Sequence, residues 1–233
     1  MGMMDSDKMT SAPCPHCGKL HEFELWMLEF KRIPLCDTCA KLQTQTWDAK
    51  KAPASWGVRY RRALPLDYQQ AQTGKIPPCY ASALDWTAEE HRGGVGLVGP
   101  SGSGKSCAMA CLLWKLEMRF IWWSGTEARD VGTQSAMSSH PDHAEACKLW
   151  QKAMTVPILV LDDLSQGRMT EAWSSRLFDL TETRKSRGLP TFWTSQIPLE
   201  ELRQKMARQN GGDTEQAMAI SRRLGQHSLV LSA

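Results

Sequence analysis

The sequence has no uninterrupted apolar run that approaches the about 18 residues needed by a membrane-spanning helix, and residues 1–8 are polar. We therefore expect neither a membrane span nor a secretory signal, and a cytoplasmic protein without membrane partners. Internal repeats and extended low-complexity segments are also absent. The charge is nearly balanced, with 28 basic and 25 acidic residues and a formal net charge of +3. This small basic excess permits nucleic-acid contact without arguing for it, so any such contact has to be inferred from local charge.

Four of the eight cysteines stand in two closely spaced pairs. Disulfides are rare in a reducing cytoplasm, which directs attention to this spacing. Each Cys-x-x-Cys turn presents two thiolates, so two such turns predict a tetrahedral zinc site, and the metal would supply folding energy that so small a module lacks. The predicted ligands are Cys14, Cys17, Cys36 and Cys39, with His16 or His21 in place of one thiolate as an alternative.

Residues 99–106 read GPSGSGKS and stand between two apolar runs, 94–98 and 107–118. This order of strand, glycine-rich loop and helix is typical of a P-loop. Glycines let successive backbone N–H groups point at phosphate oxygens, and the positive end of the following helix faces the same anion. We therefore expect ATP here, with Lys105 at the β- and γ-phosphates and Ser106 on Mg²⁺; the alternative is a flexible glycine-serine loop. The predicted nucleotide contacts are Gly99, Pro100, Ser101, Gly102, Ser103, Gly104, Lys105, Ser106 and Cys107.

Polar side chains follow two further apolar segments. Asp162 and Asp163 come directly after residues 158–161, and Gln196 follows residues 191–195. At the end of a buried strand beside a P-loop, Asp162 would hold a water ligand of Mg²⁺ and Asp163 would orient the attacking water. The amide of Gln196 would sense the γ-phosphate or position water. An ordinary acidic turn and an ordinary polar strand end are the alternatives.

The rest of the chain alternates strand and helix patterns, with strands expected at 119–123, 158–161, 191–195 and 228–231 and helices at 141–153 and 170–187. This alternation predicts an α/β fold with one parallel sheet flanked by helices and a nucleotide at its carboxyl edge. The expected organisation is a disordered tail over 1–10, a zinc-binding module over 11–45, a basic linker and lead-in over 46–80, and a P-loop ATPase domain over 81–233.

Taken together, GPSGSGKS, VLDDL, LPTFWTSQIPLEEL and ISRRLG resemble the AAA+ ATPases of bacterial helicase loading, the DnaC and DnaI type, and their IstB-type relatives. The resemblance covers about residues 55–233, and the cysteine module is similar to the amino-terminal zinc-ribbon-like domain of some loaders. It implies an AAA+ core without a carboxyl-terminal helical lid. It also implies that Gln196 is the sensor, that Arg222 or Arg223 is an arginine finger for a neighbouring subunit, and that the zinc module docks the replicative helicase.

Two positions depart from the pattern of that family. Gln196 stands where Asn is common, which keeps the amide and adds a methylene. Asp163 replaces the usual Glu, and its shorter reach affects the expected rate of hydrolysis more than nucleotide binding. The resemblance therefore implies a slow ATPase that is stimulated by its partner or by DNA.

The function implied by the resemblance is loading of a replicative hexameric helicase in DNA replication, with ATP, Mg²⁺ and Zn²⁺ as cofactors and self-association through the ATPase domain. An IstB-like transposition helper on duplex DNA and a small-molecule phosphotransferase are the alternatives. Single-stranded DNA is the expected cargo, held by basic and aromatic groups. The residues considered for this contact are Arg119, Trp122, Trp123, Arg129 and Lys148.

Overall fold

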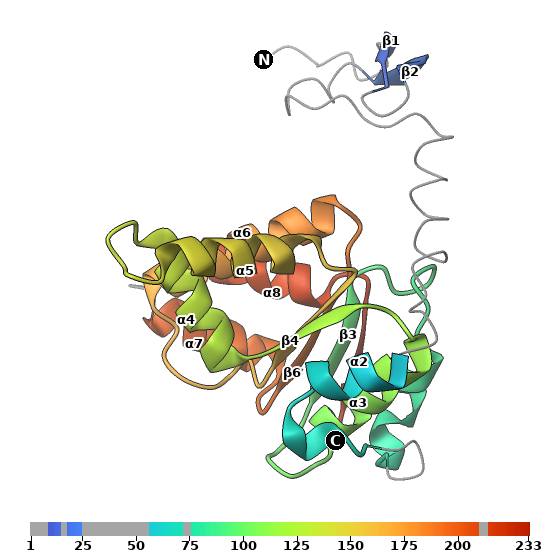
Figure 1. Cartoon of the computed structure of the whole chain (residues 1–233), viewed down its shortest axis with the longest axis vertical. Helices are drawn as coiled ribbons and strands as arrows, with labels where there is room; N and C mark the ends of the chain where they lie inside the picture. The colour runs from blue at the N-terminus through green and yellow to red at the C-terminus, as the bar shows by residue number, and fades with distance from the viewer. Residues whose placement is uncertain (1–8, 15–17, 25–55, 72–75, 210–213) are drawn as a thin grey trace. The chain divides into compact units, whose positions relative to one another are not determined.

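The computed structural model describes all of the chain except residues 1–8, 15–17, 25–55, 72–75 and 210–213 (Figure 1). The chain divides into two compact units, Met1–Lys51 and Ala52–Ala233, which are described separately. Among the described residues, no helix combines the length and the apolar character that crossing a membrane demands.

The described part of the first unit is a hairpin around Cys14. Strand β1 (Met9–Pro13) pairs antiparallel with β2 (Leu20–Glu24). Cys14 lies in the connection and is 2% exposed. The N–H of Gly18 donates to its carbonyl at 2.9 Å, and Gly18 has a φ of 72°, which a glycine adopts without strain. The other predicted zinc ligands, Cys17, Cys36 and Cys39, and the alternative ligand His16 lie outside the described residues, as does the side chain of His21.

The second unit is built on a parallel sheet of five strands in the order β4-β5-β6-β3-β7. The strands are β3 (Gly94–Val98), β4 (Phe120–Ser124), β5 (Ile158–Asp162), β6 (Thr191–Ser195) and β7 (Ser228–Ser232). The three central strands are buried along their whole length, as expected of a parallel sheet with helices on both faces. The predicted α/β fold is confirmed.

Helices cover both faces of this sheet, and each face has its own core (Figure 1). One face carries α2 (Trp56–Ala63), α3 (Lys105–Leu116) and the short 3₁₀ segments η2 (Leu66–Tyr68) and η4 (Pro78–Asp85). The other carries α4 (Gly125–Ala136), α5 (His143–Thr155), α6 (Glu171–Ser186), α7 (Leu199–Gln209) and α8 (Thr214–Gly225). Thr170 caps α6, since its side chain accepts from the N–H of Trp173 at 3.3 Å.

The described part of the segment expected as linker and lead-in packs onto the five-stranded domain. Trp56 and Tyr60 lie one turn apart on α2 and face inward, where both rings contact Phe120 at centroid distances of 6.1 and 6.0 Å. The hydroxyl of Tyr60 donates to the carbonyl of Ala110 in the middle of α3. Together with η2 and η4, which pack on α3, these aromatic contacts leave α3 buried from residue 108 to 113.

A fully buried arginine ties α6 to the amino edge of the sheet. Arg184 donates to the carbonyls of Ala153 and Pro190 at 2.6 Å each, to that of Val156 at 3.0 Å, and to the hydroxyl of Thr191 at 3.0 Å. Burial lowers the pKa of Arg184 from its ordinary 12.5 to about 9. The guanidinium satisfies backbone oxygens that the ends of α5 and of the strands leave without helical or sheet partners.

Candidate nucleotide-binding site

The loop between β3 and α3 has the backbone geometry of an anion cradle. Gly102 and Gly104 have φ values of 78° and 87°, which side chains disfavour, and Gly104 immediately precedes α3. Gly99 lies so close to η4 that a Cβ there would stand 2.4 Å from the Tyr80 hydroxyl. That hydroxyl donates to the Val98 carbonyl at 2.8 Å and lies 3.0 Å from the Ser103 hydroxyl. Tyr80 of the lead-in therefore packs against the loop between β3 and α3. The loop runs directly into the N-terminus of α3, where backbone N–H groups can bind an anion.

Lys105 lies inside this loop and is 7% exposed. Its Nζ donates to the carbonyls of Gly99 at 2.6 Å and Pro100 at 2.8 Å. Burial lowers the pKa of Lys105, and the nearby carboxylates of Asp163 and Asp162 partly oppose that shift. Two loop carbonyls thus hold the ammonium in this structure.

Asp162 accepts two hydrogen bonds at the carboxyl edge of the sheet. Ser106 donates to its Oδ1 at 2.8 Å, and Thr194 from the neighbouring strand donates to the same oxygen at 2.6 Å. Burial raises the pKa of Asp162, while the two hydroxyl donors act in the opposite direction. Because both donors use Oδ1, Oδ2 is available to a further ligand. A carboxylate and a serine hydroxyl at this spacing are hard oxygen donors that fit Mg²⁺ with its waters.

Asp163 and Gln196 are in direct contact. Gln196 Nε2 donates to Asp163 Oδ2 at 2.8 Å, and the Ser165 hydroxyl donates to Oδ1 at 3.1 Å. Asp163 has a left-handed φ of 55°, stabilised by a bond of 2.8 Å from its N–H to Thr194 Oγ1. The structure therefore brings together Lys105, Ser106, Asp162, Asp163 and Gln196, all of which were predicted from the sequence.

Sequence reasoning missed the polar and aromatic groups that support these residues. Thr194 touches both acids, and its place in the Thr-Ser-Gln segment was the signal that could have indicated it. Tyr80 and Tyr68 come from the lead-in, for which the sequence offers no comparable signal. The Tyr68 ring lies 5.5 Å from that of Trp122. Burial raises the pKa of Tyr68.

The two arginines near the carboxyl terminus lie at the opposite edge of the sheet. They precede β7, whose first residue Ser228 pairs with Gly94 at the start of β3, whereas the P-loop follows the end of β3. Arg223 is held by α6: it donates to Glu182, and its guanidinium lies 4.4 Å from the Phe178 ring centroid. Arg222 is exposed and points to no partner within the described ranges.

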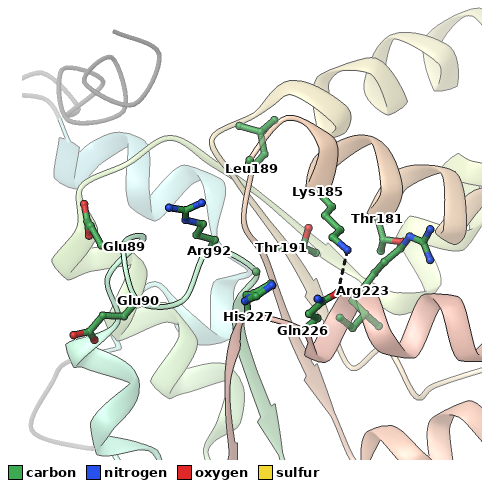
Figure 2. Close-up of a pocket in the computed structure, with 13 residues that line it drawn as sticks. Glu89, Glu90, Arg92, Thr181, Lys185, Leu189, Thr191, Arg223, Gln226 and His227 are labelled. Atoms are coloured by element: carbon green, nitrogen blue, oxygen red, sulfur yellow. Dashed lines mark hydrogen bonds between the residues drawn. The ribbon is translucent and has the colours of Figure 1, made fainter. Parts of the chain in front are cut away.

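A pocket of about 430 Å³ lies at this amino edge, separate from the P-loop (Figure 2). It is bounded by α6, α8 and the turn before β3, and Figure 2 shows Lys185 donating to Gln226 across one side, at 3.0 Å. Arg223 forms part of its wall and turns its guanidinium toward α6. The pocket therefore does not coincide with the predicted nucleotide site.

The structure corrects two residues considered for DNA contact. Trp122 and Trp123 are only 8% and 4% exposed, because β4 is covered by helices on both faces, so neither can stack on a base. Arg119 and Lys148 are exposed, and Arg129 is half-buried beside Asp130, at 3.6 Å. These three cations come from the start of β4, from α5 and from α4 and do not form a shared surface with the two tryptophans.

The strand order, the P-loop after β3 and the acids at the end of β5 define a P-loop domain of the AAA+ fold. The structure is similar to the DnaC helicase loader, with a TM-score of 0.56 and 16% identity over 72% of this chain and 99% of that one. For DnaI the TM-score is 0.58 at 17% identity, over 72% of this chain and 94% of that one.

A Streptococcus pyogenes serotype M3 protein described as a primosome component gives a TM-score of 0.55 at 18% identity, over 78% of this chain and 97% of that one. No protein-family model matches the chain, and no curated protein matches it either. At these identities the likeness establishes the fold, and the chemistry has to be argued from the site.

Proposed function

We propose that this protein is an ATP-dependent loader of a replicative hexameric helicase in DNA replication. The observation that carries the proposal is the convergence of Lys105, Ser106, Asp162, Asp163 and Gln196 at one edge of the sheet. The likeness to the DnaC helicase loader and to DnaI supports the choice among P-loop functions. The chain would bind ATP with Mg²⁺, single-stranded DNA and the helicase.

ATP with Mg²⁺ supplies a scissile phosphoanhydride and a cation that neutralises its developing charge. The backbone N–H groups of Gly104, Lys105, Ser106 and Cys107, at the start of α3, would hold the phosphates, and Lys105 would leave the loop carbonyls to contact them. Ser106 and Asp162 would hold the metal. Asp163 would orient water for attack, and Gln196 would report the state of the γ-phosphate through the hydrogen bond that it already donates to Asp163.

Self-association would complete the site. Arg222 and the P-loop lie at opposite edges of one sheet, so Arg222 cannot reach the nucleotide of its own chain but can reach that of a neighbour in a head-to-tail assembly. Of the two adjacent arginines, Arg222 is the better candidate for the finger, because Arg223 is bound to Glu182 and Phe178.

The first unit would dock the helicase through a zinc module. Cys14, buried at a turn whose glycine has a positive φ, suits a thiolate ligand at a zinc knuckle. Cys17, Cys36 and Cys39 complete the proposed set on sequence spacing alone. Because Met1–Lys51 and Ala52–Ala233 are separate compact units, we expect helicase docking and nucleotide binding to be separable by mutation.

The test is a reconstitution with the host's replicative helicase and circular single-stranded DNA. The full chain with ATP is expected to increase the amount of helicase stably bound to the circle and to increase unwinding. Lys105→Ala should bind no nucleotide and give no stimulation. As the control, Lys152→Ala changes an exposed lysine of α5 and should load as the wild type does.

Failure of the wild-type chain to bind the helicase or to increase its loading would overturn the proposal. If a transposase and duplex DNA raise the ATPase activity of the chain while the helicase does not, the result would support the transposition-helper alternative. ATP-dependent transfer to a metabolite without any effect of DNA would indicate a phosphotransferase.

A further inference from the structure

One tryptophan of the second unit is exposed where the others are buried. Of the eight tryptophans in the described ranges, seven are buried, and Trp114 is 43% exposed. It stands on α3 one residue after the buried stretch 108–113. Trp114 thus leaves a larger fraction of its surface in water than any other tryptophan of the described ranges, and a partly exposed indole is a large surface that can contact a ligand.

Trp114 is held in place by its neighbours on α2. Its indole lies against Gly57, where a Cβ would come within 3.5 Å of the ring, and its centroid is 4.9 Å from that of Tyr60 at an angle of 70°. Tyr60 is itself fixed by burial and by its bond to Ala110. One side of the indole is thereby supported by packed groups while the rest faces solvent, so binding a flat ligand there would cost little side-chain entropy.

Exposed cations lie on the helix that packs against this ring and next to the ring on α3. Helix α2 turns Trp56 and Tyr60 inward, so that Arg59, Arg61 and Arg62 face solvent, and the helix contains no acidic residue. None of these arginines has an ion-pair partner in the part of the chain that the structure describes. Lys115 follows Trp114, and its only acid neighbour there is exposed Asp85, at 3.8 Å. We call this surface, formed by Trp114, Arg59, Arg61, Arg62 and Lys115, the Trp114 platform.

We propose that the Trp114 platform binds single-stranded DNA, with a base stacked on Trp114 and phosphates on the arginines of α2. An aromatic ring among cations is the combination that grips single strands without sequence preference. The inference rests on the proposed function, which requires the chain to hold DNA, and adds where it is held. Four of the five residues of this surface are cations, and charged residues are depleted in the core of protein interfaces, which favours a nucleic-acid strand over a protein partner.

The platform is separate from the nucleotide site. Trp114 lies near the end of α3 and Lys105 at its start, about 14 Å apart along the axis at 1.5 Å per residue. Changes at Trp114 or on the outer face of α2 should therefore leave ATP binding unaltered. That separation lets one set of variants test the DNA surface without disabling the ATPase.

The experiment measures binding of the full chain to a fluorescein-labelled oligothymidylate by anisotropy over a range of salt concentrations. For the triple variant Arg59→Gln/Arg61→Gln/Arg62→Gln we expect at least a tenfold loss of affinity. The slope of log K against log salt should fall in magnitude by about 2, since each phosphate contact on a single strand contributes about 0.7. Trp114→Leu should weaken binding about fivefold or more without changing that slope.

The matched control is Lys148→Gln/Lys152→Gln/Arg187→Gln, which removes three exposed cations from the opposite face and should leave affinity and slope unchanged. Thermal midpoints and ATP affinities equal to those of the wild type show that the platform variants are folded. Restoring charge with Arg59→Lys/Arg61→Lys/Arg62→Lys should recover the salt slope, which a merely structural role of these side chains would not predict.

Wild-type affinity and slope in the folded platform variants would overturn this inference while leaving the proposed function intact. The same holds if these variants lose helicase and keep DNA, which would make the platform a protein-docking surface. If the wild-type chain itself binds no single strand, with or without ATP, both the platform and the DNA-binding part of the proposed function fail.

Discussion

The hydroxyl of Thr194 donates to Asp162 Oδ1 at 2.6 Å and accepts from the N–H of Asp163 at 2.8 Å. One side chain on β6 therefore fixes both Asp162, the last residue of β5, and Asp163, which follows it. Ser106 adds a second donor to Asp162 from the P-loop side. Even so, burial is the larger influence and raises the pKa of Asp162, so the ionised carboxylate is costly until a cation neutralises it.

The first prediction concerns the pH dependence of stability without nucleotide. The native pKa of Asp162 lies above its ordinary 3.8, so the folded state binds more protons than the unfolded state between those two values. The contribution of Asp162 to the free energy of unfolding is then most favourable below pH 3.8 and is lost as pH rises through the native pKa. Asp162→Asn cannot ionise and should therefore avoid that loss. Its thermal midpoint near neutral pH should be higher than that of the wild type, and the midpoint should change less with pH in the acid range.

Thermal unfolding from acid to neutral pH checks this, with Asp179→Asn as an exposed control on α6. An Asp162→Asn protein that is less stable than the wild type near neutral pH would show that hydrogen bonds from Ser106 and Thr194 outweigh burial. The same variant should lose Mg²⁺-dependent hydrolysis, because Asn offers the metal no charge.

The second prediction separates binding from hydrolysis at Asp163. Its left-handed φ of 55° is one that Asn also adopts readily, so Asp163→Asn should keep the backbone. Loss of the carboxylate that orients water should lower kcat for ATP hydrolysis by about 10²- to 10⁴-fold, while ATP affinity stays within about twofold. Steady-state hydrolysis and calorimetric ATP binding measure the two effects. A parallel loss of affinity would instead indicate that Asp163 supports the cradle.

Much of the fold and site follows from local patterns in the sequence. The strand segments at 158–161 and 191–195 are short, apolar and followed by polar residues, and parallel strands bring their carboxyl ends to one edge. That rule alone brings Asp162, Asp163 and Gln196 to the P-loop. The glycines of GPSGSGKS were predictable for the same reason, since the required backbone is local.

The rest depends on contacts between distant segments. Periodicity in FIWWS predicts a strand but not that helices cover both faces of it, so Trp122 and Trp123 were considered for DNA although both are buried. The basic composition of α2 suggested a linker, whereas Trp56 and Tyr60 one turn apart anchor it to α3 and β4. In both cases tertiary burial, which composition does not report, decides the outcome.

The third prediction tests the zinc module. Protein purified without chelator should contain one zinc per chain, and Cys14→Ser should lose it, with a cost to the first unit on the order of 10 kcal/mol. ATP affinity should not change, since the second unit is compact by itself. Elemental analysis, circular dichroism and calorimetry measure these effects. Cys79→Ser changes an exposed cysteine of the second unit and should retain the metal. A wild-type chain without zinc would contradict the prediction.

The fourth prediction distinguishes the adjacent arginines. Arg223→Ala removes a bond to Glu182, a bond of 2.9 Å to the Ala219 carbonyl and the stack on Phe178, and should lower the free energy of unfolding by about 1–3 kcal/mol. Arg222→Ala removes an exposed side chain and should change stability by less than about 0.5 kcal/mol. Urea unfolding of both variants measures the difference. A larger loss for Arg222→Ala would reverse the assignment of structural and functional roles.

The last prediction follows from the opposite edges at which Lys105 and Arg222 lie. The Lys105→Ala protein should not bind ATP but still carries Arg222. The Arg222→Ala protein should bind ATP but lacks the arginine that would act on the nucleotide of a neighbouring subunit. Each alone should hydrolyse ATP at least 10³-fold more slowly than the wild type under conditions of assembly. In a head-to-tail assembly mixed in equal parts, about a quarter of the interfaces combine an intact cradle with an intact arginine, so the mixture should recover activity. Lys105→Ala mixed with Asp162→Asn makes no complete interface and should stay inactive. Recovery in both mixtures, or in neither, would exclude an arginine acting between subunits.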